Sequence, residues 1–283
     1  MLNPIEGEIF CIDKPLTMTS FAVVKKVRAV LRTHLGTRQV KVGHAGTLDP
    51  LATGVLLLCT GHATKRIDEL QAGVKEYIAD LRLGATTPSY DLETQVDATY
   101  PWRHIDRALI DRVLQEQFTG TIEQVPPSFS ACKVDGKPAY KLARKGQDVE
   151  IRSKTLVIDE IEVLYCGLPA EPVLQLRVMC SKGTYIRALA RDIGVSLGSG
   201  AHLTALRRTR VGDVTIDKCV TLEGLVELLN HEEYVSPEQA AAERLERERI
   251  ENRERAARMK AEHQARKQEK KCDAPPRRTS QIK

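Results

Sequence analysis

Hydrophobic residues recur at helical spacing in three stretches of the first 230 residues. The first stretch follows Thr19-Ser20, a typical helix N-cap, and the three end at Gly36, Gly120 and Gly198 respectively. The apolar positions are Val24, Val27, Leu31 and Leu35; Ile105, Leu109, Val113 and Phe118; and Ile186, Leu189, Ala190, Ile193 and Leu197. This spacing predicts three amphipathic helices.

Two other stretches alternate apolar and polar residues, as half-buried strands do. Their apolar positions are Tyr77, Ala79, Leu81 and Leu83 in the first, and Leu174, Leu176, Val178 and Cys180 in the second. Strands with one polar face are typical of antiparallel sheets. We therefore expect an α+β fold with a mixed, mostly antiparallel sheet and flanking helices, rather than a doubly wound parallel fold.

Two segments depart from this pattern. Residues 126–154 begin with two prolines and carry seven basic residues against three acidic ones, which predicts a basic, turn-rich insertion. From residue 236 the chain is rich in Glu, Arg and Ala without an apolar stripe, and it has i,i+4 pairs such as Glu243–Arg247 and Glu251–Arg255. We expect a body at 1–235 and a charged helical or disordered tail at 236–283.

Charge and composition narrow the classes of function. After Ser236 there are 14 basic and 9 acidic residues, which account for the whole net charge of +5, so the body is formally neutral. Nucleic-acid binding by the body would need a local basic cluster. The longest apolar run is five residues, Val55–Cys59, and the N-terminus lacks the features of a secretory signal. Seven scattered cysteines without C-x-x-C predict reduced thiols, no metal site and a cytoplasmic protein.

The densest chemical signal is G-H-A-G-T-L-D-P-L-A-T-G at residues 43–54, directly before the apolar run. Asp49 lies between Leu48 and Leu51 beside a buried strand, where a carboxylate is costly unless it has a cationic partner or a chemical task. A structural turn aspartate fits the same pattern. A phosphate-binding glycine loop is a weaker alternative, because G-x-x-x-x-G-K-[ST] is missing.

Further motifs occur in a fixed order along the chain. They are Lys14-Pro15 with Thr19-Ser20, Gly61-His62-Ala63-Thr64-Lys65, Lys75-Glu76-Tyr77 with Leu83-Gly84, residues 139–146, residues 180–187, and residues 200–208. Together with residues 43–54 they make the chain resemble the TruB family of tRNA pseudouridine synthases over residues 8–229. The resemblance implies a pseudouridine synthase fold, with residues 126–154 as the insertion called the thumb. Because only 48 residues follow Val235 and they are highly charged, we expect no RNA-binding domain of the PUA type among them.

The resemblance assigns chemistry to three residues. Asp49 matches the catalytic carboxylate, Arg187 the arginine that pairs with it, and Tyr77 the ring on which the flipped uracil stacks. The reaction breaks the bond between ribose and N1 of uracil, turns the base and rejoins it through C5, so no cofactor is expected.

The resemblance also implies substrate-binding and RNA-contact residues. The substrate-binding set is His44, Tyr77, Tyr185, Leu206, Lys14 and Lys65, and the RNA-contact set is Lys133, Lys137, Tyr140, Arg144, Lys145, Arg207 and Arg208. We expect His44 to fill the space that the flipped base leaves, and the basic residues to contact phosphates. Taken alone, each basic residue would be interpreted as a solvated surface charge.

The expected activity is conversion of uridine 55 in the T-arm of tRNA to pseudouridine by a monomer without a metal. Two alternatives stay open at this point. One is an RNA-binding chaperone that helps tRNA to fold, which would not need Asp49, Arg187 and Tyr77 together. The other is the same chemistry on another structured RNA stem-loop, because RNA shape recurs.

Overall fold

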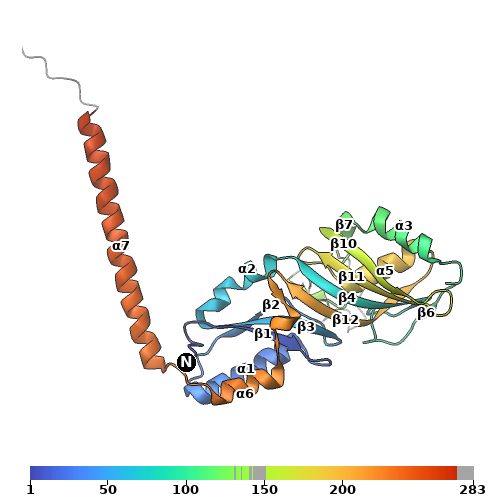
Figure 1. The fold of residues 1–283 in the computed structure, drawn as a ribbon, viewed down its shortest axis with the longest axis horizontal. Helices are drawn as coiled ribbons and strands as arrows, with labels where there is room; N and C mark the ends of the chain where they lie inside the picture. The colour runs from blue at the N-terminus through green and yellow to red at the C-terminus, as the bar shows by residue number, and fades with distance from the viewer. Residues whose placement is uncertain (131, 135, 140–141, 143–150, 273–283) are drawn as a thin grey trace, which may run out of the picture.

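A computed structural model describes residues 1–130, 132–134, 136–139, 142 and 151–272 (Figure 1). Its centre is a ten-stranded sheet whose path is β14-β1-β3-β12-β4-β11-β10-β7, with β2 paired to β3 and β13 to β12. The strands of this sheet are β1 (Ile9–Lys14), β2 (Val42–Ala45), β3 (Ala52–Thr60), β4 (Lys75–Leu83), β7 (Gly120–Gln124), β10 (Lys154–Cys166), β11 (Val173–Cys180), β12 (Ala201–Val211), β13 (Val214–Thr215) and β14 (Val220–Thr221). Only the β1–β14 and β3–β12 pairs in this sheet are parallel, so the expected mixed, mostly antiparallel sheet is confirmed.

Helices cover both halves of this sheet (Figure 1). The described helices are α1 (Ser20–Leu35), α2 (Ile67–Ala72), α3 (Arg107–Gln117), α5 (Ile186–Ser196), α6 (Leu222–His231), α7 (Pro237–Cys272) and the short 3-10 helices η1 (Gly61–Arg66) and η2 (Ile216–Lys218). Helices α1 and α6 pack on the half that contains β1 and β3, whereas α3 and α5 pack on the half that contains β4 and β11. Two small two-stranded sheets, β5 (Ala85–Thr86) with β6 (Ala98–Thr99) and β8 (Lys133–Val134) with β9 (Lys137–Pro138), complete the described elements.

The three predicted helices are confirmed as α1, α3 and α5. Helix α1 begins where predicted, because the Thr19 hydroxyl accepts a hydrogen bond from the Ala22 amide at 3.0 Å, and it ends at Gly36, which adopts a left-handed conformation with φ 61°. In α3 the prediction is correct in type but places Ile105 inside the helix, whereas Asp106 caps it. The two alternating stretches are β4 and β11, which pair with each other over their whole length.

The middle of the sheet brings β3, β12 and β4 together. Gly54 of β3 has φ 103°, and a Cβ atom there would lie 2.1 Å from the carbonyl oxygen of Arg208 in β12. Only glycine allows the two parallel strands to approach this closely. Across the other edge of β12, Arg208 is opposite Tyr77 of β4. Residues 54, 208 and 77 therefore lie side by side, although they are far apart in the sequence.

The described part of the basic insertion contains the hairpin β8–β9, so a turn-rich structure is present there. Lys133 and Lys137 lie on its two strands. Tyr140, Arg144 and Lys145 lie outside the described residues.

The tail is helical as α7, and its first three turns contact the body. Ala240 is fully buried, Asn3 donates a hydrogen bond to Glu243 at 3.3 Å, and Arg247 forms an ion pair with Glu6 at 2.7 Å. The i,i+4 spacing suggested a pair between Arg247 and Glu243. Arg247 pairs instead with Glu6 of the N-terminal segment. Residues 241–262 are otherwise exposed, and α7 extends away from the body (Figure 1).

Deleting the residues after Ser236 is expected to lower the melting temperature by roughly 2–4 °C, since the lost contacts contribute about 1 kcal/mol. Deleting only the residues after Ile250 keeps Ala240, Glu243 and Arg247, so the melting temperature should stay within about 1 °C of the full chain. Differential scanning calorimetry of the three proteins measures both changes. Equal melting temperatures for the two truncated proteins would show that the first turns of α7 do not stabilise the body.

Candidate active site

Asp49 lies in the loop between β2 and β3, and two buried side chains hold this loop from the N-terminal half. The Ser20 hydroxyl, at the start of α1, accepts a hydrogen bond from the Leu48 amide at 2.9 Å and donates one to the Leu48 carbonyl at 3.1 Å. On the other side of Asp49, the Lys14 ammonium donates to the Pro50 carbonyl at 3.4 Å. The backbone is therefore fixed on both sides of the carboxylate.

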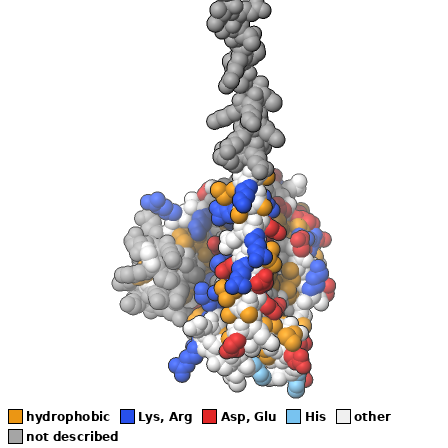
Figure 2. Space-filling model, turned by 90° about the vertical axis from the view of Figure 1, so that its left-hand side faces the viewer, with side chains coloured by type: hydrophobic (Ala, Val, Ile, Leu, Met, Phe, Trp, Pro, Cys, Tyr) orange, Lys and Arg blue, Asp and Glu red, His pale blue; other side chains and the backbone are white. Residues whose placement is uncertain are grey.

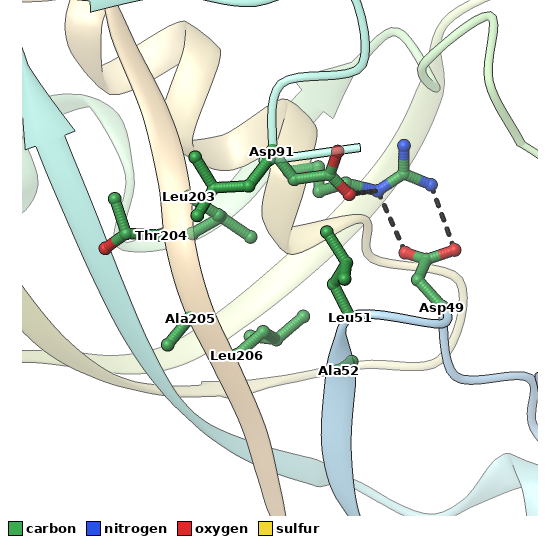
Figure 3. A pocket seen from close by; sticks show the side chains of 10 residues that line it. Asp49, Leu51, Ala52, Asp91, Leu203, Thr204, Ala205 and Leu206 are labelled. Atoms are coloured by element: carbon green, nitrogen blue, oxygen red, sulfur yellow. Dashed lines mark hydrogen bonds and ion pairs between the residues drawn. The ribbon is translucent and has the colours of Figure 1, made fainter. Parts of the chain in front are cut away.

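Arg187, the second residue of α5, meets this carboxylate from the other half of the sheet. Its Nε lies 2.8 Å from Oδ2 of Asp49 and its Nη2 lies 3.1 Å from Oδ1, a two-point contact that Figure 3 shows. The guanidinium also donates to the carbonyl oxygens of Ser89 at 3.0 Å and Phe129 at 2.9 Å. Four charge-assisted hydrogen bonds fix the planar group in one orientation.

The pair is unequally exposed. The Arg187 side chain is 3% exposed, while that of Asp49 is 36% exposed. The carboxylate is therefore the reachable member of the pair, and the arginine lies behind it. A second carboxylate, Asp91, stands 3.7 Å from Nε of Arg187 and is itself buried (Figure 3).

Asp49 and Arg187 line two cavities. The larger has about 1020 Å³ of empty space when the part open to solvent is counted, and its wall consists of Gly46, Thr47, Leu48, Asp49, Gln71, Lys75, Tyr77, Ser130, residues 181–187, Leu206 and Arg208. The smaller has about 270 Å³ and is lined by Asp49, Leu51, Ala52, Asp91, Leu92, Arg187 and residues 203–206 (Figure 3). The larger cavity has room for a nucleobase and its ribose beside the Asp49 carboxylate.

Burial raises the pKa of Asp49, and the Arg187 guanidinium opposes this change by its charge and its hydrogen bonds. The negative charges of Asp91 and Glu93 raise the pKa of Asp49 further. A carboxylate at this position must be ionised to act as a nucleophile or to stabilise positive charge on a sugar. Activity should therefore be present above the pKa of Asp49 and decline as the pH falls through it, at a higher pH than for an ordinary aspartate.

Replacing Asp91 with Asn is expected to shift the acid limb of the pH profile of the single-turnover rate to lower pH, because a charge that raises the pKa of Asp49 is removed. The measurement is single-turnover product formation between about pH 5 and 8. Asp68→Asn, an exposed charge on α2, is the matched control and should leave the profile unchanged. A shift to higher pH for Asp91→Asn would mean that its loss disturbs Arg187 more than it relieves repulsion.

Three of the predicted residues form apolar walls of the larger cavity: Tyr77, Tyr185 and Leu206. Tyr77 is the third residue of β4 and is 8% exposed, and burial raises the pKa of its phenol. Tyr185 directly precedes α5, where the buried Gln124 side chain binds both its amide, at 2.9 Å, and its carbonyl, at 3.2 Å. The aromatic side chains are thus carried by backbone that the sheet and α5 hold in place.

Lys14 and Arg208 were expected to contact phosphates of the RNA, but their side chains are buried and do not lie on the outer surface. Lys14 is fully buried and donates to the carbonyls of Met18 at 2.6 Å and Pro15 at 2.9 Å; burial lowers its pKa to about 8, against the raising effect of Asp49. Arg208 is 2% exposed and donates to the carbonyls of Val55 at 2.8 Å and Gly46 at 3.0 Å, although it lines the larger cavity. Both side chains hold the backbone around the Asp49 loop, which accounts for their cationic type.

Arg207, His44 and Lys65 are not among the residues that line the larger cavity. Arg207 lies on the face of β12 opposite to Leu206 and Arg208, because side chains alternate along a strand, and it pairs with Asp13 at 2.7 Å. His44 is half-buried on β2 with an unpartnered Nδ1, and burial together with Arg208 lowers its pKa, so its imidazole is neutral at pH 7. Lys65 is exposed at the end of η1.

Sequence reasoning missed several residues of the site. Ser89 and Asp91, which contact Arg187, lie in the run Thr86-Thr87-Pro88-Ser89-Tyr90-Asp91, whose only sequence signal is that of an ordinary turn. Lys75 and Lys182 line the larger cavity and lie within the motifs given above, but no role was expected for them. Ser130 also lines this cavity and lies near the start of the basic insertion. Gln124 has no sequence signal, because its position depends on the approach of β7 to α5.

Comparison with known proteins identifies the family of this chain. Residues 32–186 match the family described as TruB family pseudouridylate synthase (N terminal domain), and residues 187–248 match the tRNA pseudouridylate synthase B C-terminal domain. The chain belongs to the TruB family of pseudouridylate synthases. The boundary between the two matched regions lies in α5 between Ile186 and Arg187, so the paired side chains of this family member come from different matched regions.

This chain covers nearly the whole length of several relatives in the TruB family. The chain is 62% identical to the tRNA pseudouridine synthase B of Phocaeicola vulgatus over 82% of its own length and 97% of the relative. It is 60% identical to the protein of the same name from Bacteroides thetaiotaomicron, over 84% of its length and 99% of that relative.

Among solved structures, the chain is similar to one in the crystal structure of a Cbf5-Nop10-Gar1 complex, with a TM-score of 0.56, 30% identity and coverage of 80% of this chain and 55% of that one. A chain in the structure of an H/ACA RNP bound to a substrate RNA containing 2'-deoxyuridine gives a TM-score of 0.54 and 29% identity, covering 79% of this chain and 54% of that one. The TruB family member thus shares its fold with about half of each of these longer chains.

Proposed function

We propose that this TruB family member converts uridine 55 in the T-arm of tRNA to pseudouridine, with Asp49 as the catalytic carboxylate. The single observation that carries this proposal is the two-point contact between Asp49 and the buried Arg187 at the edge of a cavity walled by Tyr77. The high identity to relatives named tRNA pseudouridine synthase B over nearly their full length supports tRNA as the substrate.

The proposed reaction is an isomerisation in which atoms and charges balance. The bond between C1' of ribose and N1 of uracil breaks, the base turns, and C5 bonds to C1'. C5 then loses its proton, and N1 gains one. Asp49, held ionised by Arg187, forms a transient bond to substrate or stabilises the positive charge that develops at C1'. The cavity retains the detached base, which the ring of Tyr77 stacks against.

The binding residues are proposed on the same basis. Tyr185 and Leu206 complete the pocket wall, His44 enters the space of the flipped base as a neutral ring, and Lys65 contacts phosphate. Lys133 and Lys137, together with Tyr140, Arg144 and Lys145 of the thumb, contact the RNA backbone. The positive charges of Lys133, Lys137, Arg144 and Lys145 support phosphate contacts, and Tyr140, Arg144 and Lys145 lie within the motif at residues 139–146.

The test is to incubate the purified protein with an unmodified tRNA transcript and map pseudouridine by carbodiimide treatment and mass spectrometry. We expect one pseudouridine, at position 55. A transcript with cytidine at position 55 and an unrelated RNA stem-loop of equal length are the controls. Modification of the unrelated stem-loop would shift the proposal to a broader substrate, and tRNA binding without any product would leave a folding chaperone.

We also propose that residues 1–235 form the catalytic domain, and that the protein works as a monomer in the cytoplasm. Cys11, Cys59, Cys132, Cys166, Cys180 and Cys219 are free thiols, which fits a reducing compartment. None of the described helices is both long and apolar enough to cross a membrane. Light scattering during size-exclusion chromatography, alone and with tRNA, measures the oligomeric state.

A further inference from the structure

A second hollow of the molecule is lined by cations. It lies between α1, the loop that joins α1 to β2, β2 itself and η1, and we call it the α1–β2 groove. It has about 700 Å³ of empty space and is lined by Arg28, Arg32, Arg38, Gln39, Val40, Lys41, Val42, Gly43 and Thr64. Four of these nine residues are basic and none is acidic. Figure 2 shows the end of the molecule from which α7 extends, where Lys and Arg side chains are interspersed with Asp and Glu side chains.

The cations of the groove lack counter-charges in the described part of the chain. None of Arg28, Arg32, Arg38 and Lys41 forms an ion pair with a described residue, and all except Arg28 are exposed. Elsewhere on the body, exposed arginines such as Arg66 and Arg107 pair with a neighbouring carboxylate. A concave site with several unpaired charges of one sign concentrates an electric field that attracts anions.

Arg28 connects the groove to the framework of the protein. Its Nη2 donates to the Val42 carbonyl at 2.7 Å, which fixes the start of β2 against α1. Its Nε is buried and has no partner in the structure. Arg28 therefore positions the groove, while Arg32, one turn further along α1, and Arg38 have exposed side chains.

Strand β2 runs from this groove to the candidate active site. Val42 and Gly43 line the groove, His44 follows, and Asp49 is six residues beyond Gly43. At roughly 3.3 Å per residue the path is at most about 20 Å. Successive phosphates of a duplex strand follow one another at much shorter intervals than this, so an RNA arm that delivers a base to Asp49 carries several phosphates within this distance.

We propose that the α1–β2 groove binds the phosphate backbone of the same RNA whose uridine enters the active site. This inference rests on the proposed function for the identity of the RNA. Guanidinium groups suit phosphates because their planar donors bind two oxygens at once. Thr64 of η1 forms the opposite wall, and the exposed Lys65 follows it directly, so the groove continues toward the residue already proposed as a phosphate contact.

The test compares the double variant Arg32→Gln/Arg38→Gln with a matched control, Arg82→Gln/Arg112→Gln, whose exposed arginines lie on β4 and α3. Both doubles remove two positive charges. We measure tRNA affinity from about 50 to 200 mM salt and single-turnover product formation at saturating tRNA. The groove double should bind tRNA about tenfold more weakly at low salt, with a salt slope shallower by about 1.5 units, and should keep its saturated single-turnover rate.

The outcomes separate this inference from the proposed function. If the wild-type protein modifies tRNA but both doubles have the same affinity and slope, the groove does not contact the RNA and the inference is overturned. If the wild-type protein makes no pseudouridine in tRNA, the proposed function fails whatever the binding data show. Arg32→Lys/Arg38→Lys keeps the charge, and recovery of the salt slope in this variant would support a phosphate contact over a folding defect.

Discussion

Replacing Asp49 with Asn is expected to reduce pseudouridine formation by at least about 1,000-fold while tRNA affinity changes by less than about threefold. The amide keeps the shape of the side chain and one acceptor toward Arg187, but it has no negative charge with which to attack substrate or stabilise a cation at C1'. The measurement is single-turnover conversion of a tRNA transcript at saturating enzyme, beside an equilibrium binding curve.

The substitution also leaves the charge of Arg187 buried without its full partner, which costs stability. A melting curve and unchanged tRNA affinity therefore check that the variant is folded. Asp91→Asn is the matched control, since it removes the same charge from beside the same guanidinium but does not face the larger cavity. It should keep most of the activity at pH 7.5. Substantial turnover by Asp49→Asn would remove Asp49 from the catalytic role.

The second large effect is expected for Arg187→Lys, which should lower the single-turnover rate by about 100-fold with little change in tRNA affinity. Lysine keeps the charge but has one nitrogen. It would have to replace two contacts to Asp49 and two to the carbonyls of Ser89 and Phe129, which point to different edges of the guanidinium. The carboxylate would lose its fixed orientation in the cavity.

Arg191→Lys is the control for this prediction. Arg191 lies one turn along α5, where it contacts Asp192 at 2.7 Å and the Val125 carbonyl at 3.0 Å. Since it is outside both cavities around Asp49, its replacement should change the rate by less than about threefold. If Arg187→Lys weakened binding without slowing the single turnover, Arg187 would be an RNA contact and not the partner of a catalytic carboxylate.

The local elements were predictable because their signals are local. The Thr19 cap, the apolar spacing and Gly36 suffice for α1, and alternation suffices for β4 and β11. Each of these elements buries one face in a hydrophobic core, and the buried residues recur along the sequence with the period of the helix or strand. The motif order also led to Asp49, Arg187 and Tyr77, which the fold brings to one cavity wall.

The fate of each charged side chain was not predictable in this way. Lys14 and Arg208 have the sequence appearance of RNA contacts, yet they are among the most buried residues and hold backbone carbonyls around the Asp49 loop. Arg207 differs from Arg208 by one position and faces the other side of β12. A residue's type states which bonds it can make, but only the arrangement of neighbouring strands decides which partner is within reach.

By itself, the sequence determined the elements, the mixed sheet and the residue types of the active site, because periodicity and motif order are properties of the chain. Only the tertiary structure decided the two-point geometry of the contact between Asp49 and Arg187, which are 138 residues apart in the sequence. It alone also decided that Ser89 and Asp91 support Arg187 and that four cations line the α1–β2 groove. These contacts join segments through the central sheet and α5. Their geometry depends on the packing of distant strands, which no local pattern records.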